Sequence, residues 1–180
     1  MFEITYTGMF WFITLAWIAA RVICGVRSQK ADWKYEVKLL TVYICFVVIA
    51  RIVYFPRQLV EGKIVSLFLD VDKIFPLWVN LTPIVHLFDV YDGWQINILG
   101  NILIFVPVGL AWPFCYRKLN TIGKTVLAGG AFSLFIEITQ LPFYSRCSDV
   151  DDLILNTTGA LVGAVIYFGM KRMTAARKRT

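Results

Sequence analysis

Three polar residues open the last apolar stretch of the chain, at a spacing that could serve acid–base chemistry or ligand binding. In SDVDDLILNTTG (residues 148–159), Asp149, Asp152 and Asn156 are separated by three and then four positions. Residues at this spacing share one face of a helix. Carboxylates on such a face could act as general acids or bases, and an amide beside them could supply hydrogen bonds.

Two other apolar stretches carry polar residues at the same helical spacing. Asn97 and Asn101 are four positions apart in one of them. In the other, Ser133, Glu137 and Gln140 step by four and then three positions. Each set would line one side of its helix, so three helices would offer polar stripes to their neighbours.

The elements that position these stripes are predicted to be membrane-spanning helices. Of the 180 residues, 58% are hydrophobic, more than in an ordinary soluble domain, and the mean hydropathy is +0.67. A helix needs ~20 mainly apolar residues to cross a bilayer, and five such segments occur. They are residues 9–26, 39–55, 96–116, 125–143 and 153–170. We therefore predict an all-α, polytopic helical bundle of about five transmembrane helices, forming a single membrane domain over residues 1–180.

The charges between these segments predict an orientation. Lys and Arg residues gather after the first, third and fifth segments. The loops after the second and fourth segments carry acidic residues instead. Because cytoplasmic loops carry an excess of Lys and Arg, the pattern predicts an N-out, C-in topology. The net charge of +6 then reflects topology, and it does not form the basic, aromatic-lined face that nucleic acids require. We expect membrane lipids as partners and no nucleic acid.

The connection between the second and third segments, residues 56–95, mixes apolar runs with acids. A structureless segment of this length is improbable in so small a protein. We expect part of it to be an outer interfacial or re-entrant segment that covers the outer end of the bundle. WVNLTPI (78–84), with an aromatic anchor and a proline, marks such a return, and an ordinary surface loop is the alternative.

Helix geometry places the polar stripes in one layer. At a rise of ~1.5 Å per residue, Asn101, Glu137 and Asn156 lie very roughly 8 to 10 Å below the outer boundary. Arg51 in the second segment falls at the same depth, where pairing with Glu137 would offset the cost of burying both charges. We predict a water-accessible polar pocket that opens outward. The alternative is that these groups are interhelical glue around the small-xxx-small motif GALVG (159–163).

Metal-binding patterns are missing from the sequence. His86 is the only histidine, and Cys24, Cys45, Cys115 and Cys147 are scattered singly. Zinc sites and disulfide frameworks use paired spacings instead. We therefore expect no metal and no other cofactor, and we interpret the cysteines as packing residues.

Four motifs resemble those of the VanZ-like family of bacterial membrane proteins. They are NLTP (80–83), INILGNILIFVPVGL (96–110), SLFIEITQ (133–140) and RCSDVDDLILNTTGALVG (146–163), which together define a core of about residues 80–163. The last two are the most specific, since they fix an acid, an amide, an arginine and further acids at set spacing. Ile84 and Val108 replace phenylalanines that family members often carry at these places.

The resemblance implies a multi-pass protein of the bacterial cytoplasmic membrane, associated with reduced susceptibility to lipoglycopeptides such as teicoplanin and acting near the outer leaflet. We favour a role in binding or masking a cell-envelope lipid, a lipid-linked wall precursor or the drug. The alternative is a membrane-embedded hydrolase or transferase acting on a lipid-linked substrate, with Glu137 or Asp152 as acid or base and Arg146 as an anion clamp.

Two observations from the sequence rank these functions. No nucleophile with an adjacent base is evident, which favours binding over catalysis. The inner halves of the segments offer few polar groups, which disfavours a small transporter. Glu137 and Asp152 are the candidate catalytic residues. The candidate ligand-binding residues are Arg51, Asn80, Asn97, Asn101, Ser133, Glu137, Gln140, Arg146, Asp149, Asp152 and Asn156.

Overall fold

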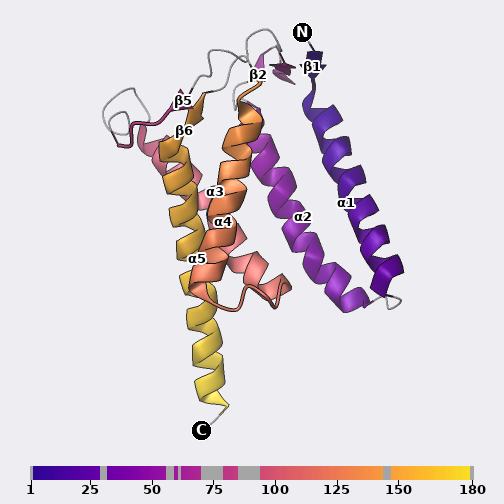
Figure 1. The fold of residues 1–180 in the computed structure, drawn as a ribbon, viewed down its shortest axis with the longest axis vertical. Coiled ribbons are helices and arrows are strands. Elements are labelled where there is room, and N and C mark those ends of the chain that lie inside the picture. Colours follow the sequence, from indigo (N-terminus) through magenta and orange to yellow (C-terminus); the bar gives the residue numbers. More distant parts are fainter. Residues whose placement is uncertain are drawn as a thin grey trace. The chain divides into compact units, whose positions relative to one another are not determined.

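Five long helices dominate the structure, a computed structural model that describes residues 2–28, 32–55, 59–60, 62–69, 79–84, 94–143 and 147–178 (Figure 1). The helices are α1 (Tyr6–Ser28), α2 (Trp33–Tyr54), α3 (Trp94–Cys115), α4 (Ile122–Gln140) and α5 (Val150–Arg177). The strands are β1 (Phe2–Ile4), β2 (Leu59–Val60), β3 (Lys63–Ile64), β4 (Leu67–Leu69), β5 (Val79–Asn80) and β6 (Ser148–Asp149). All five helices are long and apolar enough to cross a membrane, which confirms the predicted bundle of five spans.

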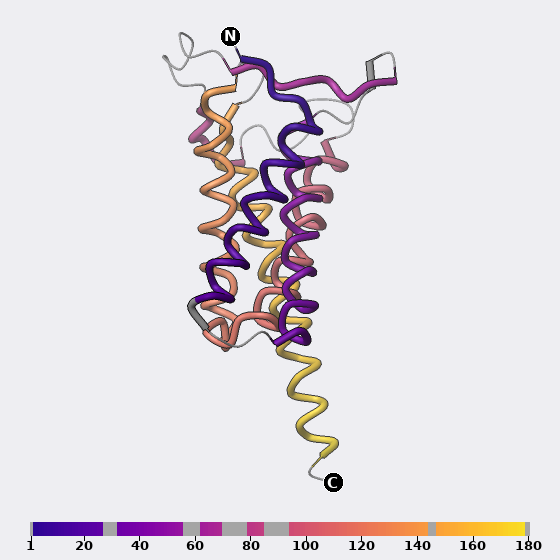
Figure 2. The backbone as a smooth tube through the Cα atoms, turned by 90° about the vertical axis from the view of Figure 1, so that its right-hand side faces the viewer, coloured from indigo at the N-terminus to yellow at the C-terminus, as the bar shows by residue number. Residues whose placement is uncertain are grey.

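Two helices extend well beyond the apolar runs that predicted them. Helix α2 begins six residues before its predicted start because Asp32 caps it, accepting from the backbone N–H groups of Lys34 at 3.0 Å and Tyr35 at 3.3 Å. Helix α5 has 28 residues, a length of about 42 Å, against ~30 Å of hydrocarbon. Its basic last turns therefore run past the ends of α3 and α4 (Figure 2). Hydropathy locates the part of a helix that crosses the bilayer, whereas caps and propensity decide where the helix ends.

The chain divides into two compact units. Unit 1 comprises Met1–Leu77 and Pro142–Arg146, and unit 2 comprises Trp78–Leu141 and Cys147–Thr180. The assignment of residues 1–180 to a single membrane domain stays a prediction, as does the N-out, C-in orientation.

Unit 1 is an α1–α2 pair with a small core at one end. Between the helices, the hydroxyls of Thr14 and Tyr43 lie 2.8 Å apart, and the Trp17 ring contacts Tyr43. The core consists of three side chains that are at most 8% exposed, with partly buried apolar residues around them. The three are Phe55, Leu67 and Phe143.

The connection after α2 contributes short strands to unit 1. Strand β4 pairs antiparallel with β1, and β2 pairs antiparallel with β3 across a turn in which Gly62 has φ +74°. Glycine adopts this left-handed conformation without a steric penalty. The described residues 59–60, 62–69 and 79–84 of this connection thus form strands and turns with no re-entrant helix among them, and Trp94 and Gln95 already belong to α3. The remainder of the segment, Trp78 included, lies outside the described residues.

Unit 2 is built around α5, which packs against both α3 and α4 (Figure 1). The α3–α5 contact is backbone to backbone. A Cβ atom on Gly159 would lie 2.1 Å from the carbonyl oxygen of Ile102, and one on Gly163 would lie 2.1 Å from that of Val106. Only glycine fits such a contact, and small residues allow this approach in membrane helices. The structure thus confirms tight packing at GALVG (159–163) and identifies α3 as its partner.

Candidate functional site

Four carboxylates gather at the end of unit 2 where α3 and α5 begin and α4 ends. We call this set the acid cluster: Glu137, Asp149, Asp151 and Asp152. Asp152 lies within electrostatic reach of the other three. The α4 and α5 stripes predicted from the sequence therefore meet, and they meet at one end of the helices.

Asp149 joins the start of α5 to the segment around Asn80. As the N-cap of α5, its carboxylate accepts from the backbone N–H of Asp151 at 2.9 Å. It also accepts from Nδ2 of Asn80 at 3.2 Å at each carboxylate oxygen. Strands β5 and β6 pair in parallel, with Asn80 opposite Asp149. The cap and the strand pair together hold the NLTP segment beside α5.

Glu137 on α4 also contacts the start of α5. Its carboxylate is 4% exposed and accepts from the backbone N–H of Asp149 at 3.0 Å. Glu137 is thus bonded to the residue that caps α5. This is a structural role that connects the end of α4 to the start of α5.

Asp151 is a member of the site that the sequence analysis missed. It is buried, and its Oδ1 accepts from the backbone N–H of Ile84 at 2.8 Å. Ile84 has φ +72°, a left-handed conformation that is unfavourable for a β-branched residue. The hydrogen bond to a buried carboxylate offsets part of this strain. The available signal was the run of acids in the first turn of a helix, where they stabilise its N-terminus.

Asp152 differs from the other three carboxylates. It accepts from Nδ2 of Asn101 on α3, and among the described residues no backbone N–H donates to it. The expected meeting of the α3 and α5 stripes is therefore realised at this pair. Asp152 is therefore the carboxylate of the cluster that accepts no backbone N–H among the described residues.

Asn156 lies one helical turn beyond Asp152 and is 2% exposed. Its Nδ2 donates to the hydroxyl of Ser133 on α4 at 2.9 Å. Its Oδ1 has no hydrogen-bond partner among the described residues. A buried acceptor without a donor costs free energy, about 1–3 kcal/mol, unless a ligand or water completes it.

The other predicted site residues lie elsewhere or beside the cluster. Asn97 is exposed on α3, and Gln140 is buried at the end of α4. Arg51 belongs to unit 1, where it donates to the carbonyl of Phe55 at 3.2 Å and lies over the ring of Tyr6. Pairing of Arg51 with Glu137 therefore stays a prediction.

The predicted ligand-binding residue Arg146 lies outside the described residues, as does His86, the only histidine of the sequence. Within the described part of unit 2, no Lys or Arg forms an ion pair with the acid cluster. The same described ranges hold no group of three or more His, Cys, Asp or Glu side chains that could bind a metal ion. The described chemistry of the site is thus that of carboxylates, amides and a hydroxyl.

Cys147 lies beside the acid cluster, and the pKa of its thiol responds to the charges of the cluster. Although the residue is exposed at the surface, protein atoms packed around the thiol raise the pKa of Cys147 above its ordinary value. Asp149, Glu137 and Asp152 raise this pKa further, because negative charges disfavour the thiolate.

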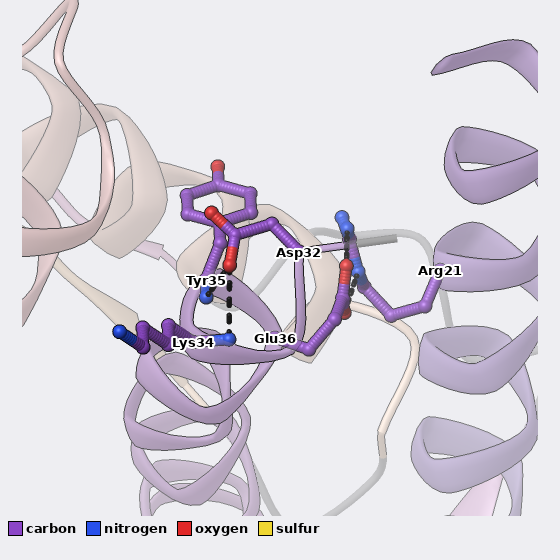
Figure 3. Close-up of polar contacts among 5 residues, drawn as sticks. All are labelled: Arg21, Asp32, Lys34, Tyr35 and Glu36. Carbon is purple, nitrogen blue, oxygen red and sulfur yellow. Dashed lines mark hydrogen bonds and ion pairs between the residues drawn. The ribbon is translucent and has the colours of Figure 1, made fainter. Parts of the chain in front are cut away.

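Unit 1 contains an ion pair of a different kind (Figure 3). Arg21 of α1 reaches Glu36 of α2 with two donors, Nε at 2.8 Å and Nη2 at 2.5 Å. Both side chains are partly exposed, at 24% and 32%. Here one charge neutralises the other, whereas the described part of the acid cluster contains charges of one sign.

Comparisons with known proteins agree with the motifs. The sequence profile of the VanZ/LLP1 family matches residues 10–172, a wider range than the motif-bearing residues 80–163. The chain is 30% identical over 88 residues to Protein VanZ of Enterococcus faecium. The aligned region covers 49% of this chain and 51% of that protein. The chain thus spans about half the length of the curated relative that it matches. No solved structure matches. With five candidate spans and a family match over most of its length, the chain is a multi-pass protein of the bacterial cytoplasmic membrane and belongs to the VanZ/LLP1 family.

Proposed function

We propose that the chain reduces susceptibility to teicoplanin-type lipoglycopeptides by binding or masking an envelope component at the acid cluster. The component is a membrane lipid, a lipid-linked wall precursor or the drug itself. Membership of the VanZ/LLP1 family and the similarity to Protein VanZ support the link to resistance. The binding role is the part that the geometry of unit 2 supports.

The observation that carries the binding role is the contrast between Asp152 and the other carboxylates of the cluster. Glu137, Asp149 and Asp151 each accept a backbone N–H and so help to build the site. Asp152 accepts only a side-chain amide among the described residues. The Asp152 carboxylate accepts no backbone N–H among the described residues, and the buried Asn156 beside it has an Oδ1 without a donor. Such acceptors are suited to contacting a ligand.

The proposal includes the orientation predicted from the charges. Unit 2 carries Arg117 and Lys118 between α3 and α4 and Lys124 in the first turn of α4, at the end of these helices opposite the acid cluster. If Lys and Arg mark the cytoplasmic side, the cluster faces outward. The outer leaflet is where lipoglycopeptides meet their targets.

A resistance assay tests the proposal. The wild type, Asp152→Asn and the matched control Asp32→Asn would be expressed in a susceptible Gram-positive host at equal membrane levels. We expect the wild type and the control to raise the inhibitory concentration of teicoplanin, and Asp152→Asn to lose most of that increase. Protection that survives Asp152→Asn unchanged would remove the acid cluster from the mechanism.

The same cells separate binding from the enzymatic alternative. Paired carboxylates at Glu137 and Asp152 are the specific feature that keeps hydrolysis or group transfer in view. Lipid intermediates extracted from wild-type and Glu137→Gln cells would be compared by mass spectrometry. A binding protein leaves their chemical structures unchanged, whereas a product present with the wild type and absent with Glu137→Gln would identify an enzyme.

A further inference from the structure

We infer that the acid cluster and Asn156 together bind a primary ammonium group carried by an amphiphile at the membrane surface. This inference rests on the binding role proposed above and names the chemical class of what is bound. It is carried by the charge of the cluster, by the open acceptor of Asn156 and by the apolar residues at the rim of the site.

The charge of the site calls for a cation. Its four carboxylates lie close together at the end of apolar helices, and within the described part of unit 2 no Lys or Arg forms an ion pair with them. Burying like charges is unfavourable, and either protonation of a carboxylate or a bound cation relieves the repulsion. A bound ammonium group supplies both the charge and three N–H donors. The exposed apolar residues Leu81 and Ile84 beside the site favour an organic cation.

Asn156 is the second, independent observation. It is 2% exposed, and Oδ1 is left without a donor while Nδ2 is bonded to Ser133. Helical side chains tilt toward the N-terminus of their helix. On α5 this tilt directs Asn156 toward Asp152 and the acid cluster, one turn away. The open oxygen and the Asp152 carboxylate are therefore neighbouring acceptors for N–H donors.

The rim of the site is apolar, which points to an amphiphile. Leu81 is 75% exposed and Ile84 is 59% exposed. They lie in residues 79–84, a segment that Asn80 and the Ile84 N–H fasten to Asp149 and Asp151. Apolar side chains beside an acidic site match a molecule with an ammonium headgroup and an apolar body.

Nanodiscs provide the test. The full-length chain would be reconstituted in phosphatidylcholine nanodiscs containing equal small amounts of phosphatidylethanolamine or its N,N-dimethyl derivative, and retained lipid would be quantified by native mass spectrometry. These headgroups share a positive charge but differ in N–H donors, with three, one and none in the series that ends at phosphatidylcholine. We expect phosphatidylethanolamine to be retained about tenfold or more over phosphatidylcholine, with the dimethyl lipid between them.

Variants locate the binding. Asp152→Asn and Asn156→Leu should each lose most of the preference for phosphatidylethanolamine, whereas Asp32→Asn, an acid of unit 1, should keep it. Equal retention of the three lipids by the wild type would overturn the inference, even if a variant failed to fold. So would a preference that survives both substitutions in unit 2. That result would place the ammonium-binding site outside the acid cluster.

A competition arm identifies the source of the ammonium group. Soluble glycerophosphoethanolamine, which lacks acyl chains, should displace the lipid only if the headgroup alone is recognised. Displacement indicates a soluble or drug-borne amine, and its absence indicates a membrane lipid. Resistance with no lipid preference would leave the proposed function intact and refute the ammonium class. Loss of both would refute the two together.

Discussion

Units 1 and 2 hold their membrane-spanning helices together by different means. In unit 1, α1 leaves its apolar side chains exposed and meets α2 through a few polar and aromatic contacts, among them Arg21–Glu36. In unit 2, α5 lies in backbone contact with α3, and hydrogen bonds join it to α4. Burial of apolar surface does not drive helices together inside a bilayer. The difference therefore shows that the sequence specifies the geometry of unit 2 much more closely than that of unit 1.

The largest effect is expected where backbones touch. Gly159→Ala would place a methyl group 2.1 Å from the carbonyl oxygen of Ile102, so α3 and α5 must separate. We expect the free energy of unfolding to fall by about 1–3 kcal/mol, as for other overpacked sites. SDS titration of the purified protein in detergent measures this. Gly169→Ala, on the same helix with nothing within 4 Å, is the matched control and should change little.

A smaller loss of stability is expected when either of the two aspartates that cap helices is replaced, and the loss should differ between them. Asp32→Ala and Asp149→Ala each remove an N-cap, at a cost of about 1 kcal/mol. Asp149→Ala also frees Asn80, which should add about 1 kcal/mol. Hydrogen exchange should show faster exchange at residues 79–84 in Asp149→Ala only. Equal stability losses and no change at 79–84 would mean that Asp149 acts as a cap and nothing more.

The ion pair of unit 1 should contribute less. Arg21 and Glu36 are partly exposed, and exposed pairs typically contribute about 0.2–1 kcal/mol. A double-mutant cycle with Arg21→Met and Glu36→Gln should give a coupling free energy in this range that declines as salt is added. A coupling well above that range would show that unit 1 is held more firmly than its exposed helix suggests.

The smallest effect concerns the thiol beside the acid cluster. Since its pKa is raised, Cys147 has less thiolate near neutral pH than an ordinary cysteine and should react more slowly with maleimide. The rate should increase as pH rises through the thiol pKa. Asp149→Asn keeps a good N-cap but removes a negative charge, so it should speed the reaction at most severalfold.

The same reagent examines orientation. An impermeant maleimide added to intact cells should label Cys147 if the cluster faces outward. Labelling only after the cells are opened would contradict the N-out, C-in topology. A rate that does not respond to Asp149→Asn would show that the carboxylates leave the thiol unaffected.

The helices could be predicted from the sequence because a span needs a long apolar run, and five runs are present. Periodicity also brought together Glu137, Asp152 and Asn156, since residues three and four apart share a helix face. The ends of α2 and α5 could not be predicted from hydropathy, because the Asp32 cap and the basic tail lie outside the apolar runs.

The rest of the site depends on contacts between distant parts of the chain. Asp151 lies off the predicted stripe, and its importance comes from Ile84, 67 positions away in the sequence. Strands β5 and β6 have two residues each, too few for an alternating pattern to reveal them. Neither the left-handed backbone conformation of Ile84 nor the two-residue pairing of β5 with β6 produces a periodic pattern in a single sequence.

The position of α5 determines the order in which unit 2 can assemble during biosynthesis. Helices α3 and α4 contact each other far less than each contacts α5, which follows both of them in the chain. Within unit 2, the two earlier helices therefore gain their main partner only after α5 has been synthesised. A chain truncated before residue 150 would leave them exposed to lipid and to membrane proteases. Synthesis of α5 is thus the step that brings the residues of the polar site together.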